Sequence, residues 1–475
     1  MVCKNFAYPE LMKYFEDISA IPRASYREEK ISEYLVNFAK ERGLEYYCDK
    51  VGNVLINKAA SKGREGDYAI LLQGHTDMVC EKNEGVDHDF STDPLKLYEK
   101  DGWLRAEGTT LGADNGVAVA VMLALLDGAT ESHRAIQCLF TVSEEVGLDG
   151  AKEFDYSRIY ARKMINMDSA DEKLITAGCA GGLRSNISVP ITREGINGEV
   201  FKITVKGLFG GHSGEDIHRG RANANKVMGR ILAACLEKDD SLRLVSVGGG
   251  TKENAIPRES EAVVVCKNIE AFKNTAEKIS SEIKAELCKD DSAFRVKIEP
   301  TNNRFEAMDE ASTKKVVFFI STIANGIFAM SAELEGIVEY SRNLGVVSTA
   351  EEKFEAVLNT RSARDSQIDC SIREIDQYAK MLSGSSAHYN RYPGWVYAET
   401  SEIREEYAKA YAELFGERPK VEVIHAGLEC GVIKAAIPDM DMISCGPVVV
   451  NLHSPDEALD LASFERFFKV IKNLI

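Results

Sequence analysis

Apolar residues in the first 180 positions are grouped in short runs that end at glycines or charged residues. The run over 68–73 is compact and is followed by Gly74, so it predicts a buried strand that ends in a loop. The pattern also predicts amphipathic helices from Pro9 and over 26–42, a buried helix over 117–126, and strands over 135–142 and 163–167. Because strands alternate with helices, we predict an α/β fold with a mostly parallel mixed sheet and helices on both of its faces.

The pattern changes near Gly181. Short β-branched runs over 201–205 and 262–265 predict strands with antiparallel character, and helices are predicted over 222–237 and 271–287. A second set follows, with helices predicted over 314–323 and 372–382 and a strand over 354–360. Its order loosely echoes the first set, so a duplicated α+β unit is one interpretation of this region.

The α/β pattern returns after about residue 393, with strands predicted over 421–424 and 442–444 and a last helix from Pro455. We therefore predict an α/β domain that is split in the sequence into residues 1–184 and 393–475. An α+β domain, residues 185–392, would be inserted between the two segments.

The composition argues against some classes of partner. The 475 residues include 58 lysines and arginines and 75 aspartates and glutamates, and the net charge of −17 would repel phosphate backbones and anionic lipids. We therefore expect no nucleic-acid partner and no membrane partner. The 11 cysteines are scattered without a CxxC pair, which is typical of a reducing compartment. The N-terminal segment lacks a signal-peptide core and the longest apolar run is too short to cross a bilayer, so we expect a cytoplasmic protein.

Histidines and carboxylates stand where the predicted strands end, which is where parallel sheets bind their ligands. The loops contain, in chain order, His75 and Asp77, Asp114, Glu144 and Glu145, Asp168, and finally His453. Two imidazoles with three or more carboxylates suit a pair of divalent metal ions such as zinc, with manganese and cobalt as alternatives.

Each of these residues also has an ordinary explanation. A single carboxylate at a strand end is most often a helix cap or a solvated charge, and His75 alone could be a partly buried histidine. A metal site is favoured because four successive strand-end loops and one distant loop all carry such residues beside glycines. A two-metal site also needs a base that binds neither ion, and either Glu144 or Glu145 could serve. Asp77 could hold the far ring nitrogen of His75.

The motifs HTDMV, LGADNG, SEEVG, NMDS and LHSPDE closely resemble those of the co-catalytic zinc exopeptidases, a family that includes glutamate carboxypeptidase, peptidase T and the carnosinases. The resemblance extends over nearly the whole chain, including a split catalytic domain and an inserted lid domain. Two further segments, HAGLECG (425–431) and LNTRS (358–362), resemble the aminoacyl-histidine dipeptidase branch of this family.

The resemblance implies a role for each metal-site residue. Asp114 would bridge the two ions, His75 and Asp168 would complete one site, and Glu145 and His453 would complete the other.

The same resemblance implies that Glu144 is the general base and that Asp77 orients its neighbouring histidine. In this family the bridging aspartate is followed by a cis peptide without proline. The bond between Asp114 and Asn115 is therefore expected to be cis.

The inserted domain has its own candidates. His212 lies in a Gly-rich loop and could be a solvated histidine, but it resembles the lid histidine that hydrogen-bonds the oxyanion of the reaction. Asn254 and Arg361 resemble the groups that bind the terminal carboxylate of the substrate, and the planar guanidinium suits a carboxylate. His425 and Glu429 remain open, because they could contact the substrate or only shape their loop.

These expectations describe a cytosolic two-metal hydrolase that cleaves dipeptides, with Xaa-His dipeptides as the substrates that the resemblance implies. An aminoacylase or deacetylase of the same fold would share every metal ligand and is the alternative enzyme. A scaffold that binds metal without catalysis would be expected to lose the base or a ligand, and all are present here. A phosphoryl-transfer enzyme is disfavoured because no phosphate-binding loop is found. A homodimer through the lid domain is also compatible with the resemblance.

Overall fold

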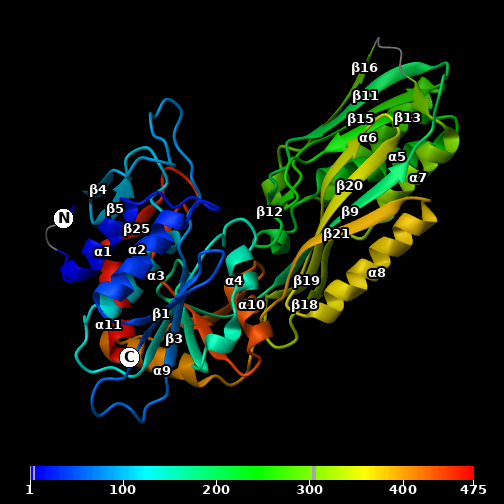
Figure 1. The fold of residues 1–475 in the computed structure, drawn as a ribbon. Coiled ribbons are helices and arrows are strands. Elements are labelled where there is room, and N and C mark those ends of the chain that lie inside the picture. Colours follow the sequence, from blue (N-terminus) through cyan, green and yellow to red (C-terminus); the bar gives the residue numbers. More distant parts are fainter. Residues whose placement is uncertain (1, 4–5, 302–305) are drawn as a thin grey trace. The chain divides into compact units, whose positions relative to one another are not determined.

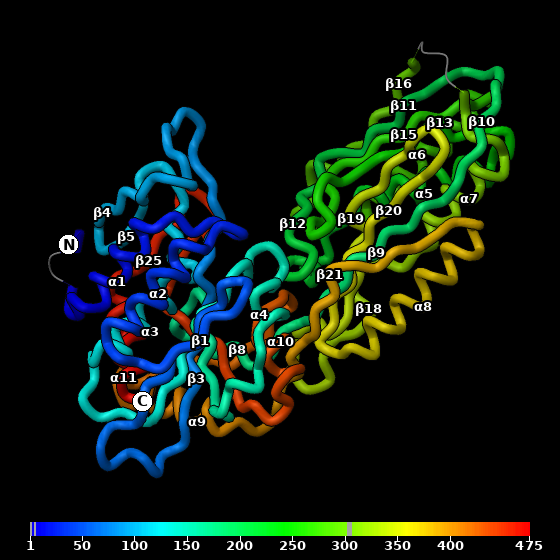
Figure 2. The backbone as a smooth tube through the Cα atoms, in the orientation of Figure 1, coloured from blue at the N-terminus to red at the C-terminus, as the bar shows by residue number. Residues whose placement is uncertain are grey.

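The computed structural model describes residues 2–3, 6–301 and 306–475. They form two compact units; Figure 1 labels many of their elements and Figure 2 traces their backbone. The first unit runs to Cys179 and resumes over Trp395–Val423 and Leu428–Ile475, and the second comprises Ala180–Gly394 and Ile424–Gly427. We predicted changes of domain after residues 184 and 392. The chain crosses after Cys179 and Gly394, and the brief return over Ile424–Gly427 was not predicted.

The first unit is built on an eight-stranded sheet. Its strands, in spatial order, are β1 (Glu45–Cys48), β2 (Val54–Lys58), β6 (Ile136–Thr141), β3 (Ile70–His75), β7 (Lys163–Asn166), β23 (Asp441–Ser444), β8 (Leu174–Cys179) and β22 (Lys420–Ile424). The four central strands β6, β3, β7 and β23 are parallel, whereas β1, β2 and β8 join by antiparallel pairs. Every residue of β3 and β6 is buried, so both faces of the centre are covered. The α/β class is confirmed.

The helices of the first unit are α1 (Pro9–Ser19), α2 (Glu29–Glu41), α3 (Ala113–Leu126), α4 (Asp149–Glu153), α9 (Glu402–Phe415), α10 (Glu429–Ala436) and α11 (Leu461–Leu474). A small antiparallel sheet accompanies them, in the order β24 (Val449–Val450), β25 (Ala458–Asp460), β5 (Trp103–Ala106) and β4 (Leu97–Lys100). Three predicted helix starts in this unit were wrong, and the buried helix α3 begins at Ala113 rather than at residue 117. The second helix begins at Glu29 because Tyr26 has a φ of 62°. The last begins at Leu461, because the residues before it form β25 and Asp460 caps the helix.

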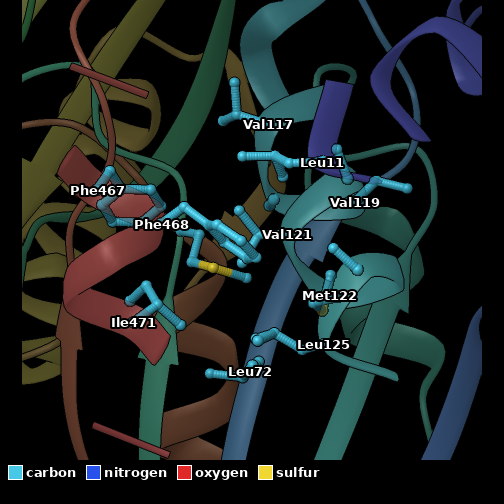
Figure 3. Packing of buried hydrophobic residues seen from close by; sticks show 14 of the residues in the cluster. Leu11, Leu72, Val117, Val119, Val121, Met122, Leu125, Phe467, Phe468 and Ile471 are labelled. Carbon is cyan, nitrogen blue, oxygen red and sulfur yellow. The ribbon is translucent and has the colours of Figure 1, made fainter. Parts of the chain in front are cut away.

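Helix α3 lies at the centre of the main apolar core. It is apolar on all sides and can therefore be stable only where it is enclosed. Figure 3 shows its residues Val117, Val121 and Leu125 among side chains from α1, β3 and α11, including Leu72 and Phe468. Because β3 and α3 are both buried, the end of β3 and the start of α3 are held in fixed positions, and the candidate ligands His75 and Asp114 stand there.

The second unit contains a nine-stranded antiparallel sheet. Its strands are β16 (Arg295–Pro300), β11 (Glu199–Lys206), β15 (Ser260–Cys266), β13 (Arg243–Gly249), β19 (Val338–Thr349), β20 (Lys353–Ser362), β9 (Gly181–Pro190) and β21 (Ser385–Tyr392), with β18 (Gly326–Met330) paired to β19. The helices are α5 (Ala224–Lys238), α6 (Ile269–Glu286), α7 (Glu310–Thr322) and α8 (Asp365–Met381). Two short pairs complete the unit: β10 (Arg193–Glu194) with β17 (Ala307–Met308), and β12 (Gly211–His212) with β14 (Ala255–Ile256).

The same strand order occurs twice in this sheet. When the strands of each half are numbered along the chain, β16-β11-β15-β13 and β21-β9-β20-β19 both read 4-1-3-2. The halves join where Gly249 of β13 pairs with Val347 of β19. The four helices and the inward strand residues share one core. A duplicated α+β unit would produce this order, and the duplication itself stays a prediction.

In the described part of the chain, no helix is both long and apolar enough to cross a membrane.

Candidate metal centre

The first group of candidate ligands forms at the carboxyl ends of β3 and β7. His75 is the last residue of β3, and its side chain is only 1% exposed. Its Nε2 lies 3.0 Å from Oδ1 of Asp114 and 3.5 Å from Oδ1 of Asp168, which follows β7. Asn115 fixes this carboxylate by donating a hydrogen bond of 3.0 Å from Nδ2 to Oδ1 of Asp168. The parallel pairing of β3 with β7 thus places His75 and Asp168 side by side.

The second group uses the other oxygen of the same aspartate. Nε2 of His453 lies 3.2 Å from Oδ2 of Asp114 and 3.2 Å from Oε1 of Glu145. Ligand atoms within each group, His75–Asp114–Asp168 and Asp114–Glu145–His453, lie within 4.8 Å of one another. One carboxylate oxygen of Asp114 therefore faces each group, which is the arrangement of a carboxylate that bridges two ions. The peptide bond between Asp114 and Asn115 is cis, as expected.

The donors of both groups fit divalent metal ions. Each group combines one imidazole with two carboxylates, a set that suits zinc, manganese or cobalt. Oε1 of Glu145 is buried and accepts no hydrogen bond from a described residue. A buried carboxylate oxygen is costly without a partner, and a metal ion would supply one.

Glu144 stands beside the two groups. Its Oε2 lies 4.0 Å from Nε2 of His75, and the two residues also form a ligand-capable group with Glu145. Burial raises the pKa of Glu144 well above its usual value, and the nearby carboxylates of Asp168 and Glu145 add to the effect. A carboxylate with a raised pKa can both accept and return a proton.

Asp77 is completely buried beneath His75. Its carboxylate accepts hydrogen bonds from Oγ of Ser25 at 2.8 Å and from the backbone N–H groups of Glu144 at 3.0 Å and Glu145 at 3.3 Å. Nδ1 of His75 lies 3.1 Å from the backbone carbonyl of Asp77 and 3.3 Å from its carboxylate. The carbonyl is therefore the closer partner of the ring, and the carboxylate also ties the glutamate loop to the histidine loop.

The crowded carboxylates are balanced by the two imidazoles. The hydrogen bond with Asp114 and the nearby carboxylate of Glu145 raise the pKa of His453 to about 11. Burial opposes ionisation of Asp114, but hydrogen bonds with His453 and His75 outweigh it and lower its pKa. Burial and the neighbouring Asp114 raise the pKa of Asp168 to about 7. The site thus concentrates negative charge that needs cations close by.

The other predicted residues belong to the second unit. His212 on β12 has Nε2 3.3 Å from a terminal nitrogen of Arg361 on β20, and the other terminal nitrogen of Arg361 lies 3.3 Å from the hydroxyl of Tyr392. The backbone carbonyl of Asn254 accepts the N–H of Ser213 at 2.8 Å. The second unit therefore gathers His212, Arg361 and the Asn254 segment in one region.

His425 also lies in this region. It is buried, and its Nε2 is 2.7 Å from the hydroxyl of Ser341 on β19. Its backbone carbonyl stands so close to Gly214 that a β-carbon there would overlap it. His425 is thus built into the second unit and supports the loop that carries His212.

Buried charged residues near the metal groups had no predicted role. Glu429 is fully buried and accepts hydrogen bonds from Gln73 and, at 2.7 Å, from Thr141, and burial raises its pKa to about 7. Arg23 is also buried and donates to backbone carbonyls of the loops that follow β3 and precede α3. The sequence segment around Glu429 marked it as a candidate, but it did not predict the residues that Glu429 contacts. Arg23 gave none, because its partners are backbone atoms.

Comparison with known proteins places the chain among peptidases. Residues 71–475 match the family model described as peptidase family M20/M25/M40. The chain is 37% identical over 469 residues to the cytosol non-specific dipeptidase of Escherichia coli (strain K12), covering 98% of this chain and 96% of that protein. The crystal structure of aminoacylhistidine dipeptidase from Vibrio alginolyticus matches with a TM-score of 0.91 at 36% identity, covering 99% and 96% of the two chains. Aminopeptidase PepT from Bacillus cereus, with a TM-score of 0.56 and 18% identity over 99% of both chains, shares the fold.

The family match begins within β3 and continues to the last residue, so it includes both ligand groups. The resemblance indicated by the short sequence motifs is confirmed over nearly the whole chain. The protein belongs to peptidase family M20/M25/M40.

Proposed function

We propose that this protein is a metal-dependent hydrolase that cleaves the peptide bond of dipeptides. The observation that carries the proposal is the carboxylate of Asp114, whose two oxygens face two separate groups of ligand-type side chains. In this proposal His75 and Asp168 hold one divalent ion with Asp114, and Glu145 and His453 hold the other. Zinc suits these donors best, with manganese and cobalt as alternatives. The Escherichia coli relative is named as a cytosolic protein, and we propose the same location for this one.

Bound divalent ions would polarise the scissile carbonyl and lower the pKa of the attacking water. The chain itself supplies the proton transfer. Glu144 accepts the proton of the water and then delivers it to the nitrogen of the leaving amine, so it acts first as base and then as acid. Its raised pKa suits the second step, because a stronger base holds the proton until the amine is formed. Asp77 fixes the ring of His75 and the backbone of the glutamate loop throughout.

The proposal assigns substrate contacts to the second unit, and the hydrogen bonds of His212 support this role. The N–H of Glu215 donates to Nδ1 of His212 at 3.2 Å, so in the neutral ring Nε2 must carry the proton. Nε2–H and the guanidinium of Arg361 are then two donors that face each other without an acceptor between them. Anionic oxygens of the substrate would satisfy these two donors.

Arg361 is well suited to hold a carboxylate. It is buried, and its Nε donates no hydrogen bond to a described residue. A buried guanidinium with free donors binds a carboxylate strongly and in a defined orientation. We assign the terminal carboxylate of the dipeptide to Arg361 and Asn254, and the oxyanion of the reaction to His212.

The names of the relatives leave the side-chain preference open. The Vibrio alginolyticus protein is named for aminoacylhistidine substrates, whereas the Escherichia coli protein is named non-specific. We propose dipeptides as the substrate class and Xaa-His dipeptides as members of it. An aminoacylase that acts on N-acyl amino acids is the second candidate, because its metal ligands would be the same.

One substrate panel separates these candidates. The protein is stripped of metal, reloaded with Zn²⁺, Mn²⁺ or Co²⁺, and assayed with β-alanyl-histidine, other Xaa-His dipeptides, dipeptides without histidine, and N-acetyl amino acids. We expect hydrolysis of dipeptides that depends on metal and requires a free terminal carboxylate. Hydrolysis of the N-acetyl amino acids alone would overturn the proposal in favour of the aminoacylase.

A further inference from the structure

Glu457 is a buried carboxylate to which neither the sequence nor the proposed mechanism gives a role. It is 2% exposed and lies four residues after His453. Its two oxygens accept hydrogen bonds from four consecutive backbone N–H groups: Leu111 at 2.8 Å, Gly112 at 2.9 Å, Ala113 at 2.9 Å and Asp114 at 3.3 Å. These groups belong to the turn that begins α3 and ends at Asp114.

The carboxylate of Glu457 caps this turn. The first N–H groups of a helix have no partner within the helix and need an acceptor. The N-cap residue of α3 is Gly112, which has no side chain to provide one. Glu457 supplies the acceptor from a distant part of the chain, at the point where the non-helical backbone of Asp114 and Asn115 interrupts the start of α3.

Arg23 holds the same turn from the other side. Its guanidinium donates to the carbonyl of Gly112 at 2.6 Å and to the carbonyl of Thr76 at 2.9 Å, next to His75. A β-carbon at Gly112 would overlap the guanidinium, and this glycine has a φ of 66°. The turn before Asp114 is therefore clamped through its carbonyl by Arg23 and through its N–H groups by Glu457.

The two metal groups depend on this clamp to different degrees. Asp114 belongs to both groups, but Arg23 also ties its turn to the loop after His75. His75 ends the buried strand β3 and Asp168 closely follows β7, so the sheet fixes these two residues. His453 stands in a loop, its side chain is 49% exposed, and its φ is 60°. The loop of His453 is joined to the turn of Asp114 by the hydrogen bonds of Glu457.

We propose that Glu457 is a positioning residue for the group formed by Asp114, Glu145 and His453. It would allow that group to bind its ion by locking the His453 loop to the start of α3. The inference rests on the proposed two-metal function. It adds that the affinity for one of the two ions is controlled by a side chain that touches neither ion.

The test is the metal stoichiometry of Glu457→Gln compared with Asp456→Asn. Both variants remove one negative charge from adjacent residues, but Asp456 is exposed. Glutamine keeps the shape of Glu457 but turns an N–H₂ group toward backbone donors. Binding of Zn²⁺ to the metal-free proteins is measured by equilibrium dialysis and elemental analysis. We expect Glu457→Gln to bind the first ion normally and the second about 10–100-fold more weakly, and Asp456→Asn to match the wild type.

A spectroscopic measurement separates positioning from general damage to the fold. The visible absorption of added Co²⁺ is recorded for one and for two equivalents. We expect the first equivalent to give the wild-type spectrum in Glu457→Gln and the second to give a changed or missing band. If Glu457→Gln yields no folded protein, Glu457→Asp is used, and we expect the same selective loss to a smaller degree.

The failures are distinguishable. If the wild type binds two ions and Glu457→Gln binds both with unchanged affinity, Glu457 is not a positioning residue. If Glu457→Gln bound both ions more weakly to the same degree, the inference would also be overturned, because Glu457 would then not act on one ion alone. A wild-type protein that binds fewer than two ions would overturn the proposed metal centre itself.

Discussion

Two adjacent glutamates, Glu144 and Glu145, follow β6 but have different neighbours. Glu145 shares a ligand group with Asp114 and His453, and one of its oxygens is buried without a hydrogen bond from a described residue. Glu144 stands 4.0 Å from Nε2 of His75 and has a raised pKa. These surroundings suit a ligand at Glu145 and a base at Glu144.

Replacing each glutamate tests this division. We expect Glu144→Gln to keep both metal ions and to lower kcat by a factor of about 10²–10⁴, because proton transfer is lost while the ligands remain. The matched variant, Glu145→Gln, is expected to lose one ion. Both quantities are measured on the same samples by elemental analysis and dipeptide hydrolysis. A loss of metal in Glu144→Gln would mean that ligand and base have been exchanged.

Two histidines of the second unit are expected to remain neutral in mildly acidic solution. Burial and the positive charge of Arg361 lower the pKa of His212 to about 4 and that of His425 to about 3, from an ordinary value of 6.5. NMR titration of the imidazole protons should therefore show no ionisation of either residue between about pH 5 and pH 7. Ionisation near pH 6.5 would contradict the burial and charge described for them.

The lowered pKa values of His212 and His425 should make the folded protein less stable as the pH falls. Below about pH 6.5 the unfolded chain binds protons at His212 and His425 that the folded protein does not bind. The free energy of unfolding should therefore fall as the pH is lowered from about 6.5 toward 4. The double variant His212→Gln/His425→Gln should show a flatter dependence on pH over this window.

At the scale of elements, the sequence predicted the strands and helices whose positions follow from the local spacing of apolar residues. The buried run at β3 and the wholly apolar α3 could be recognised because both must be enclosed wherever they lie. The candidate ligands at their ends could then be grouped, because parallel strands end at one edge of a sheet. The contacts of Arg23 and Glu457 could not be predicted, because their partners are backbone atoms whose positions depend on the folded chain. The start of α11 was missed because β25 is specified by pairing with β5 and β24.

The close packing of α3 against β3 gives a prediction at this scale. A β-carbon at Gly74 would overlap Oδ1 of Asn115 and the side chain of Ala118. Gly74→Ala should therefore lower the free energy of unfolding of the first unit by about 1–3 kcal/mol. It should also weaken metal binding, because Asn115 holds Asp168.

Urea unfolding of the metal-free protein measures the effect. Trp103 and Trp395, the two tryptophans of the sequence, both belong to the first unit, so their fluorescence reports its unfolding. The matched control is Gly66→Ala, where a β-carbon would meet open space. Equal stability of the two variants would show that the helix can move away from the strand at little cost.

At the scale of the whole molecule, the chain leaves the first unit after Cys179 and returns to it at Trp395. The change of pattern near Gly181 signalled the inserted α+β region. The strand order of the second unit could not be predicted, because it is determined by pairings between strands far apart in the sequence, such as β9 with β20. A homodimer through the second unit stays a prediction, and the oligomeric state in solution is its test.

The central claim is that both ligand groups must be filled for dipeptide hydrolysis. It is tested most directly by titrating the metal-free protein with Zn²⁺ while dipeptide turnover and bound metal are measured on the same samples. We predict that activity is absent without metal and reaches its plateau when two ions are bound to each chain. Full hydrolysis by the metal-free protein, or a plateau at a single bound ion, would contradict the account.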